Sequence, residues 1–567
     1  IVFLGGQFKD EVYFRMKCNM RREYTKPLFL LYSIFIYVLI LIPVSFAISE
    51  LHINSSLELL NVANNISIKN IGYFRPEISE FYIYVFALLA LPVVIIACKL
   101  CLADINDIFY GKRAYNTVFI ISILFILISA LYSMDTEWGV SHYKYYLGKT
   151  VFNDKALILY LAVASIAMFF YTSIKKIRIF IDDKTTIKIF LDSVINAMTI
   201  FFLLSLFLIN IFGVNAIDET TVSTFHLNAI YYSLVQLVNS TDVLYADKFS
   251  NTYGLYPHIL EPIFHIIGGV NIWNFSIVMS TLVFISYYAV YRTMKGVISN
   301  RFYLNIGFLT ILWFQYYASK PAEFDYYFQY APLRTLFPSL LIFIAYKYIE
   351  SSNKIYYFFG CVISAVSIFW NFDSGVVVLL SWLLFSIYTS MGLEDVSIKN
   401  KVVIALKKVL FLIFIVFIFI VFYYYYIVIL LGAESFTYQK IFSSINLFSI
   451  LGYLMEPIPI RHPWVVLMIV YIVAFSHSLL SINDRINFKR NSMVFLLSIM
   501  GFGLFTYYLG RSINLNLLTV SMPAIILITL YVDSLYFGRN RRFILLHEKF
   551  FFILITVFLS FSVINVG

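Results

Sequence analysis

Long apolar runs separated by short polar segments extend along the whole chain. A helix that crosses the hydrocarbon core of a bilayer needs about 20 mainly apolar residues, and the repeated runs of this kind therefore predict an all-α, polytopic bundle of about fifteen transmembrane helices. The expected helices are 27–49, 81–102, 115–133, 156–174, 189–213, 272–291, 303–318, 336–349, 355–371, 375–391, 409–432, 464–482, 494–509, 517–536 and 549–565.

The distribution of positive charge predicts the orientation of this bundle. Cytoplasmic loops carry an excess of Lys and Arg; with a cytoplasmic N-terminus and strict alternation, roughly three quarters of the 41 Lys and Arg residues fall on the cytoplasmic side. The long loops, 50–80, 134–155, 214–271, 319–335 and 433–463, then all lie on the opposite face. Because long loops in compact proteins are usually functional, we expect the working site on the extracytoplasmic face.

Composition excludes several classes of protein. The chain is 61% hydrophobic and 13% charged, about half the charged fraction of a soluble domain. Its net charge of +10 is spread over short clusters between apolar runs, which argues against a nucleic-acid-binding domain. We find no P-loop, HExxH or GxSxG motif. The few histidines are dispersed, so no zinc site is expected and no residue is selected as a metal ligand.

The loop 214–271 contains the strongest chemical signal. Asp218 and Glu219 follow the fifth expected helix closely, so their carboxylates would lie near the low-dielectric membrane boundary. A carboxylate there needs a partner or has a raised pKa, and either state suits a general base that takes a proton from a hydroxyl group. The alternative is that the two residues are solvated acids on an ordinary loop.

The same loop contains further polar candidates beside an apolar stretch. Candidate substrate contacts along it are His226, Asp247, Tyr253, Tyr256 and His258. The stretch 258–269 is too short to span a bilayer, and we expect a juxtamembrane or re-entrant helix there.

The helix, the acidic pair, the interfacial stretch and the segment from Asp247 through Tyr-Gly-Leu-Tyr-Pro257 together resemble the first external loop of GT-C glycosyltransferases. Asp218-Glu219 is similar to the acidic motif of protein O-mannosyltransferases and aminoarabinose transferases. The explicit motifs cover about forty residues, while the arrangement of helices is similar over about 190–540. In the family this loop follows the first helix, and here it follows the fifth. We therefore expect an N-terminal module of four helices (1–188) before a GT-C-like core (189–567).

The resemblance implies a function. It implies an inverting glycosyltransferase that moves a sugar from a polyprenyl-phosphate donor to a glycan, lipid or protein acceptor, with Asp218 as catalytic base and Glu219 as its alternate. It implies a membrane-embedded enzyme, placed in the bacterial inner (plasma) membrane with the active site facing the periplasm or exterior. A divalent cation, Mg or Mn, stays open, since some relatives use a metal and others do not.

Other residues on the expected external face fit this chemistry. Arg334, Arg461 and Arg511 stand at the outer ends of expected helices, where positive charge is otherwise rare. A guanidinium group binds phosphate through paired hydrogen bonds, although each arginine could instead reach toward lipid headgroups. Asp373, in Trp-Asn-Phe-Asp-Ser-Gly375, is either a substrate contact or part of a tight turn.

Two other functions remain possible on sequence alone. A lipid or oligosaccharide flippase or transporter often shows internal repeats and charged groups in mid-membrane, and we find no repeat here. An O-antigen polymerase or ligase also has many helices and external arginines. Its arginines usually lie in one large external loop, whereas acidic residues come first in the main loop of this chain.

Overall fold

The computed structural model describes residues 33–48 (without 35 and 46), 78–101, 185–215, 225–239, 243–244, 253–317, 328–393, 396–433, 436–437, 452–459 (without 454), 464–484 and 486–537. Within these ranges every regular element is helical: α3 (Ile78–Cys101), α8 (Thr185–Asn215), α9 (Phe225–Asn239), α10 (Tyr256–Ile266), α11 (Ile272–Val297), α12 (Arg301–Leu312), the π-helix η4 (Trp313–Tyr317), α13 (Leu336–Ser351), α14 (Lys354–Trp370), α15 (Phe372–Met391), α16 (Ile398–Tyr425), the π-helix η5 (Tyr426–Leu430), α18 (Trp464–Leu480), α19 (Phe488–Gly510), α20 (Asn514–Val520) and α21 (Met522–Phe537).

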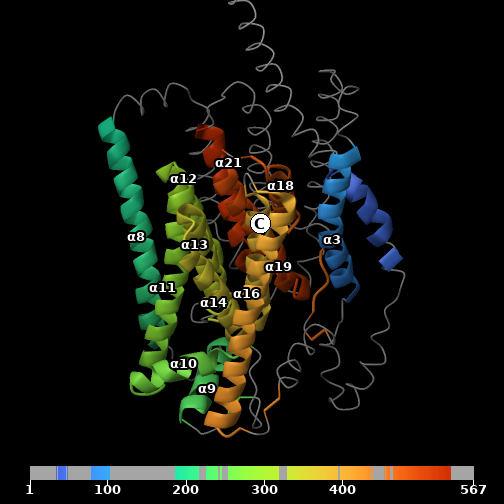
Figure 1. Ribbon diagram of the computed structural model, residues 1–567. Coiled ribbons are helices and arrows are strands. Elements are labelled where there is room, and N and C mark those ends of the chain that lie inside the picture. The colour runs from blue at the N-terminus through green and yellow to red at the C-terminus, as the bar shows by residue number, and fades with distance from the viewer. Residues whose placement is uncertain are drawn as a thin grey trace, which may run out of the picture.

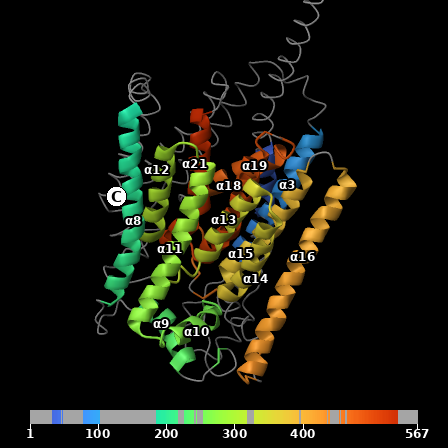
Figure 2. The ribbon, with the colours of Figure 1, turned by 60° about the vertical axis from the view of Figure 1, so that its left-hand side comes forward.

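The long helices form a bundle in which their axes run broadly along one direction, and α9 and α10 lie across its lower end (Figure 1 and Figure 2). In the described part of the chain, five helices are long and apolar enough to cross a membrane: Ile78–Cys98, Ile272–Val297, Phe372–Met391, Ile398–Leu430 and Phe488–Gly510. For the described residues the all-α prediction is confirmed, and these helices indicate a membrane protein; the expected number of about fifteen transmembrane helices and their orientation stay predictions.

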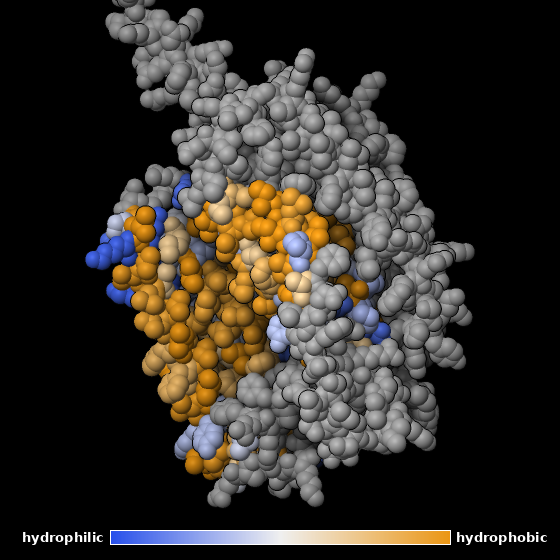
Figure 3. Space-filling model, turned by 90° about the vertical axis from the view of Figure 1, so that its right-hand side faces the viewer, coloured by the Kyte–Doolittle hydropathy of each residue, from blue (hydrophilic) through white to orange (hydrophobic). Residues whose placement is uncertain are grey.

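Burial separates the central helices from the peripheral ones. The apolar window of α19 is 78% buried, and that of the Ile398–Leu430 helix is 17% buried although its mean hydropathy is far higher. Phe414, Phe417 and Phe422 of this helix are more than half exposed. A helix that is apolar all round and largely uncovered needs an apolar solvent. Figure 3 shows a broad apolar surface with hydrophilic residues gathered at its upper left edge.

Polar side chains fix where several helices begin. The first backbone N–H groups of a helix have no partner within the helix, and an Asn or Ser side chain can accept a hydrogen bond from one of them. Caps of this kind start α11, α12, α14, α15 and α16, and they are supplied by Asn271, Asn300, Asn353, Asn371 and Ser397.

At the lower end of the bundle, a short connection joins α10 to the turn between α14 and α15. Gly254 has φ of +109°, and a Cβ built on it would lie 2.5 Å from the carbonyl oxygen of Trp370. The N–H of Leu255 donates to the carbonyl of Phe369 at 2.9 Å. The side-chain amide of Asn371 donates to the carbonyl of Tyr253, also at 2.9 Å. The start of α10 is therefore fastened to the α14–α15 turn.

At the opposite end of the bundle, a buried carboxylate ties α21 to the corner between α11 and α12. Asp533 is 6% exposed. Its two oxygens accept hydrogen bonds from the backbone N–H groups of Ser299 and Asn300, each at 2.9 Å. These two backbone amide groups compensate the buried negative charge of Asp533, and no basic side chain is needed for it to hold the corner in place.

The expected helix ranges agree with the structure wherever it describes them, with three differences. The helix expected at 409–432 begins at Ile398, because Ser397 caps it. The helix expected at 517–536 is divided at Ser521 into α20 and α21. The sequence did not predict α9, inside the long loop, whereas the helix expected near 258–269 is α10. The expected helices 115–133, 156–174 and 549–565 lie outside the described residues.

We expect Gly254→Ala to lower the free energy of unfolding by about 3 kcal/mol, because the methyl group adds a clash to backbone strain. Gly268→Ala is the matched control: Gly268 has φ of +91° with nothing within 4 Å of its Cβ position, so only strain of about 1 kcal/mol remains. Thermal unfolding of the purified protein in detergent would measure both. Equal losses would show that the contact with Trp370 does not constrain the chain.

Candidate functional site

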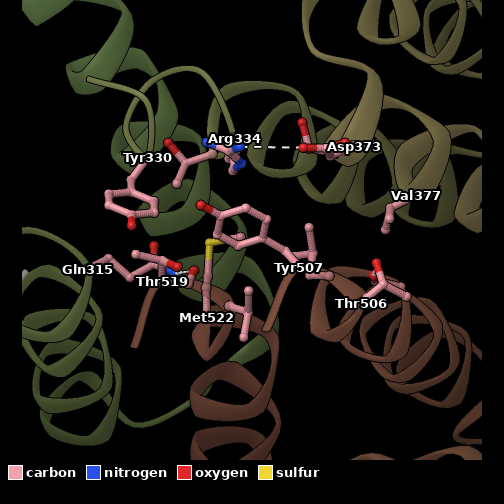
Figure 4. A pocket seen from close by; sticks show the side chains of 14 residues that line it. Gln315, Tyr330, Arg334, Asp373, Val377, Thr506, Tyr507, Thr519 and Met522 are labelled. Carbon is pink, nitrogen blue, oxygen red and sulfur yellow. Dashed lines mark hydrogen bonds and ion pairs between the residues drawn. The ribbon is translucent and has the colours of Figure 1, made fainter. Parts of the chain in front are cut away.

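A pocket lies among segments that are distant in sequence (Figure 4). Its empty space is about 470 Å³, part of it open to solvent. The walls come from η4, the turn 328–335, the first turn of α15, the last turns of α19, and α20 with the start of α21. The residues that carry polar groups into its lining are Gln315, Tyr330, Arg334, Thr335, Asp373, Ser374, Thr506, Tyr507 and Thr519.

The centre of this pocket is the guanidinium group of Arg334, whose side chain is only 13% exposed. One terminal nitrogen, Nη1, donates to the carbonyl of Gln329 at 2.7 Å. The group lies over the ring of Tyr507, 4.1 Å from the ring centroid, and at 5.9 and 6.0 Å from the rings of Tyr253 and Tyr330. The faces of aromatic rings attract cations, most strongly where water is excluded.

The only acidic partner of Arg334 among the described residues is Asp373. Nη2 of Arg334 lies 3.4 Å from Oδ2 of Asp373, which is long for a charge-assisted hydrogen bond. The Asp373 side chain is 49% exposed, so water screens its charge. The cation is therefore much more deeply buried than the carboxylate that faces it, and the pocket keeps a positive interior.

Two hydrogen-bond donors on residues of the pocket have no acceptor within the described part of the chain. Nε of Arg334 and Oγ1 of Thr335 are buried and make no hydrogen bond to any described residue, and both residues line the pocket. A buried donor without a partner costs about 1–3 kcal/mol, so native proteins rarely leave one unsatisfied without a reason. Because both atoms are covered, an oxyanion bound beside Arg334 would supply acceptors once the side chains shift enough to uncover these donors.

The backbone around Arg334 is held by its neighbours. In the turn 328–335, the N–H of Arg334 donates to the carbonyl of Tyr330 at 2.9 Å. The indole N–H of the buried Trp370 donates to the carbonyl of Leu333 at 3.0 Å. The hydroxyl group of Tyr330 donates to Oδ1 of Asn516 at 2.9 Å. These bonds connect the turn to α14 and α20, which limits how far Arg334 can move.

Asp373 is placed by the short turn before α15. Oδ1 of Asn371 accepts hydrogen bonds from the backbone N–H of Ser374 at 3.0 Å and from its hydroxyl group at 2.8 Å. Gly375 packs directly on the carbonyl of Ser367, where any side chain would collide. The sequence left a substrate contact and a turn cap both open for Asp373; the capping residue is Asn371, and Asp373 lines the pocket.

The structure thus brings together three of the residues selected from the sequence. Arg334 and Asp373 line the pocket, and the ring of Tyr253 lies 5.9 Å from the Arg334 guanidinium. Tyr256 and His258 are not among the lining residues. The hydroxyl group of Tyr256 is instead buried against Ser233 Oγ at 2.6 Å and the carbonyl of Ile230 at 3.0 Å.

The remaining candidates do not line this pocket or cannot be placed. Arg511 caps α19, its N–H donating to the carbonyl of Tyr508 at 3.0 Å, and it is not a lining residue. Asp218, Glu219, Asp247 and Arg461 lie outside the described residues. His226 is on α9, but the structure does not describe its side chain.

Several lining residues were not selected from the sequence. Gln315 lies within a helix expected at 303–318, and a polar amide inside an apolar run was a usable signal. It occurs in the π-helix η4, and π-helical turns are frequent at functional sites. Its amide donates to the carbonyl of Thr519 at 2.6 Å. Tyr507 had no such signal, because tyrosines are abundant at the ends of transmembrane helices.

A second polar cluster lies where α10 meets η5. Glu261 Oε2 accepts a hydrogen bond from the hydroxyl group of Tyr426 at 2.8 Å. The imidazoles of His258 and His265 lie 3.7 Å from its two oxygens. His258 is buried, and neither of its nitrogens makes a hydrogen bond to a residue that the structure describes. Within the described ranges, no group of three or more His, Cys, Asp or Glu residues could hold a metal ion.

Comparison with protein-family models, with curated proteins and with solved structures finds no significant match to the chain.

We expect Tyr507→Leu to lower the free energy of unfolding by about 2 kcal/mol, because it removes the aromatic face that stabilises a desolvated cation. Tyr507→Phe, which keeps the ring, should change stability little. Thermal unfolding in detergent would compare the two. If the Phe variant lost as much as the Leu variant, the hydroxyl group rather than the ring would be the stabilising feature.

We expect the stability contribution of Glu261 to depend on pH. Burial raises the pKa of Glu261, but Tyr426, His258 and His265 together outweigh burial, so that this pKa lies below the ordinary value of 4.5. A lowered carboxyl pKa stabilises the folded state above the unfolded pKa, and the contribution is lost as pH falls through the folded pKa.

Glu261→Gln should therefore be less stable than the unsubstituted protein near pH 7, with a difference that narrows below about pH 4.5. Thermal unfolding measured from pH 7 to pH 3 would test this. Tyr426→Phe, which removes one stabilising donor, should show a smaller change in the same direction. A constant difference across this range would mean that ionisation of Glu261 does not contribute.

Proposed function

We propose that this protein is a membrane glycosyltransferase that uses a polyprenyl-phosphate-linked sugar as donor, with Arg334 holding the donor phosphate. The supporting observation is the nearly buried guanidinium in a pocket that also contains two donors without acceptors. A phosphate diester carries one negative charge and several acceptor oxygens, so it matches both the charge and the unsatisfied donors.

The distribution of charge supports an extracytoplasmic position for the pocket. Among the described residues, basic side chains gather at the end of the bundle away from α10; they are Arg292, Lys295, Arg301, Lys347, Lys354, Lys399, Lys401, Lys407, Lys408, Lys489 and Arg490. Arg334 and Arg511 are the described Lys or Arg residues at the α10 end. The positive-inside rule then assigns the α10 end to the exterior.

The chemistry follows from a direct displacement. A carboxylate takes the proton of the acceptor hydroxyl, and the acceptor oxygen attacks the anomeric carbon from the face opposite the phosphate. The bond between the anomeric carbon and the phosphate oxygen breaks, the lipid phosphate leaves with the electron pair, and the configuration is inverted. Arg334 stabilises the charge that develops on the phosphate, and Asp218, with Glu219 as alternate, is the proposed base.

Replacement of Arg334 tests the proposal. Arg334→Gln should lower kcat/KM for sugar transfer from a polyprenyl-phosphate sugar by at least about 100-fold, the usual effect of removing one donor that stabilises developing charge. Arg292→Gln is the matched control, because Arg292 is exposed at the opposite end of the bundle. Asp218→Asn should lower the rate by about 100-fold or more through loss of the base.

The assay is transfer of radiolabelled sugar in proteoliposomes, with the amount of folded protein equalised by size-exclusion chromatography. Unchanged transfer in the Arg334 and Asp218 variants would contradict the proposal. Movement of a labelled lipid across the bilayer without any covalent product would support a flippase instead. Labelling of a cysteine introduced at position 220 from the cytoplasmic side would exclude Asp218 as a base for an external acceptor.

A further inference from the structure

The carboxylate of Asp373 stands at the rim of the pocket with one oxygen available. Oδ2 faces Nη2 of Arg334. Oδ1 makes no hydrogen bond to any residue that the structure describes, and the side chain is 49% exposed. The cap supplied by Asn371 and the close packing of Gly375 fix the turn that carries it. Asp373 is therefore a pre-positioned acceptor beside a site for an anion.

This arrangement restricts which anions can bind. An oxyanion on Arg334 brings its negative charge close to the carboxylate of Asp373; water screens part of the repulsion, and the remainder weakens binding of a simple phosphate. A ligand offsets this loss of binding free energy if it also donates a hydrogen bond to Asp373. An ammonium group would stand beside the poorly solvated guanidinium and be repelled in turn. A neutral hydroxyl group has neither disadvantage.

We propose that Asp373 is a specificity-determining residue, which accepts a hydrogen bond from a hydroxyl group of the sugar attached to the phosphate that Arg334 binds. The inference rests on the proposed function and adds the group that is selected: a neutral, hydroxylated sugar next to the phosphate, rather than a plain phosphate diester. The side chains of Tyr330 and Tyr507, which line the pocket, provide aromatic surface beside such a sugar.

Binding of two matched lipids to the full-length protein in nanodiscs tests the inference. Both are farnesyl phosphate diesters with one negative charge: one carries a methyl group, and the other carries glucose, galactose or mannose. The unsubstituted protein should bind at least one glycosyl diester about ten-fold more tightly than the methyl diester, as expected for a hydrogen bond to a charged group. Intrinsic tryptophan fluorescence or thermophoresis would give the dissociation constants.

Asp373→Asn should reduce this preference to less than about three-fold and should tighten binding of the methyl diester, because the repulsion is gone while the shape is kept. If Asp373 had a purely structural role, the substitution would weaken the binding of both lipids equally. Thermal unfolding of the variant checks that it is folded, as expected for a half-exposed side chain.

The outcomes separate the two proposals. If the unsubstituted protein binds both kinds of diester equally, or if Asp373→Asn leaves the ratio unchanged, the role of Asp373 is overturned and the phosphate site stands. If neither lipid binds, or if Arg334→Gln weakens the binding of neither lipid, the proposed phosphate site is wrong. The proposed role of Asp373 is then wrong as well.

Discussion

The burial of one guanidinium group constrains the lower end of this bundle. A cation with a largely covered side chain must be compensated, and a single carboxylate at 3.4 Å that is itself half exposed does so only weakly. The compensation comes mainly from the ring of Tyr507 and the carbonyl of Gln329. These two groups stabilise the charge without neutralising it, which leaves a positive interior able to receive an anion.

The turn between α14 and α15 positions the parts of the site relative to each other. Trp370 bonds to the segment that carries Arg334, and Asn371 bonds both to the start of α15 and to the segment that carries Tyr253. These two adjacent residues thus connect three segments: one 118 positions away in the sequence, one 37 positions away, and the adjoining start of α15. The cation, the carboxylate and one of the aromatic rings are held by one short piece of backbone.

Within the described residues the sequence predicted where most of the long helices lie, because the length of an apolar run reflects the thickness of a bilayer. It also selected Arg334 and Asp373, since charge at the outer ends of apolar helices is costly and therefore informative. It could not predict that these residues meet, or that Tyr507 lies under the guanidinium, because neither apolar periodicity nor local spacing encodes which helices are neighbours. His258 was selected as a substrate contact, yet it is buried against Tyr423 and Tyr426, since a lone histidine gives no sign of its surroundings.

The carboxylate of Asp533 also affects how the wall of the distant pocket is held. By fastening α21 to the corner before α12, it joins the two helices whose lower ends carry Met522 and, through η4, Gln315. The hydrogen bonds at the far end of the bundle thereby fix these two helices, which both contribute to the pocket wall, to each other. The relative placement of Met522 and Gln315 in the pocket wall thus depends on a hydrogen-bonded carboxylate that is not itself a lining residue.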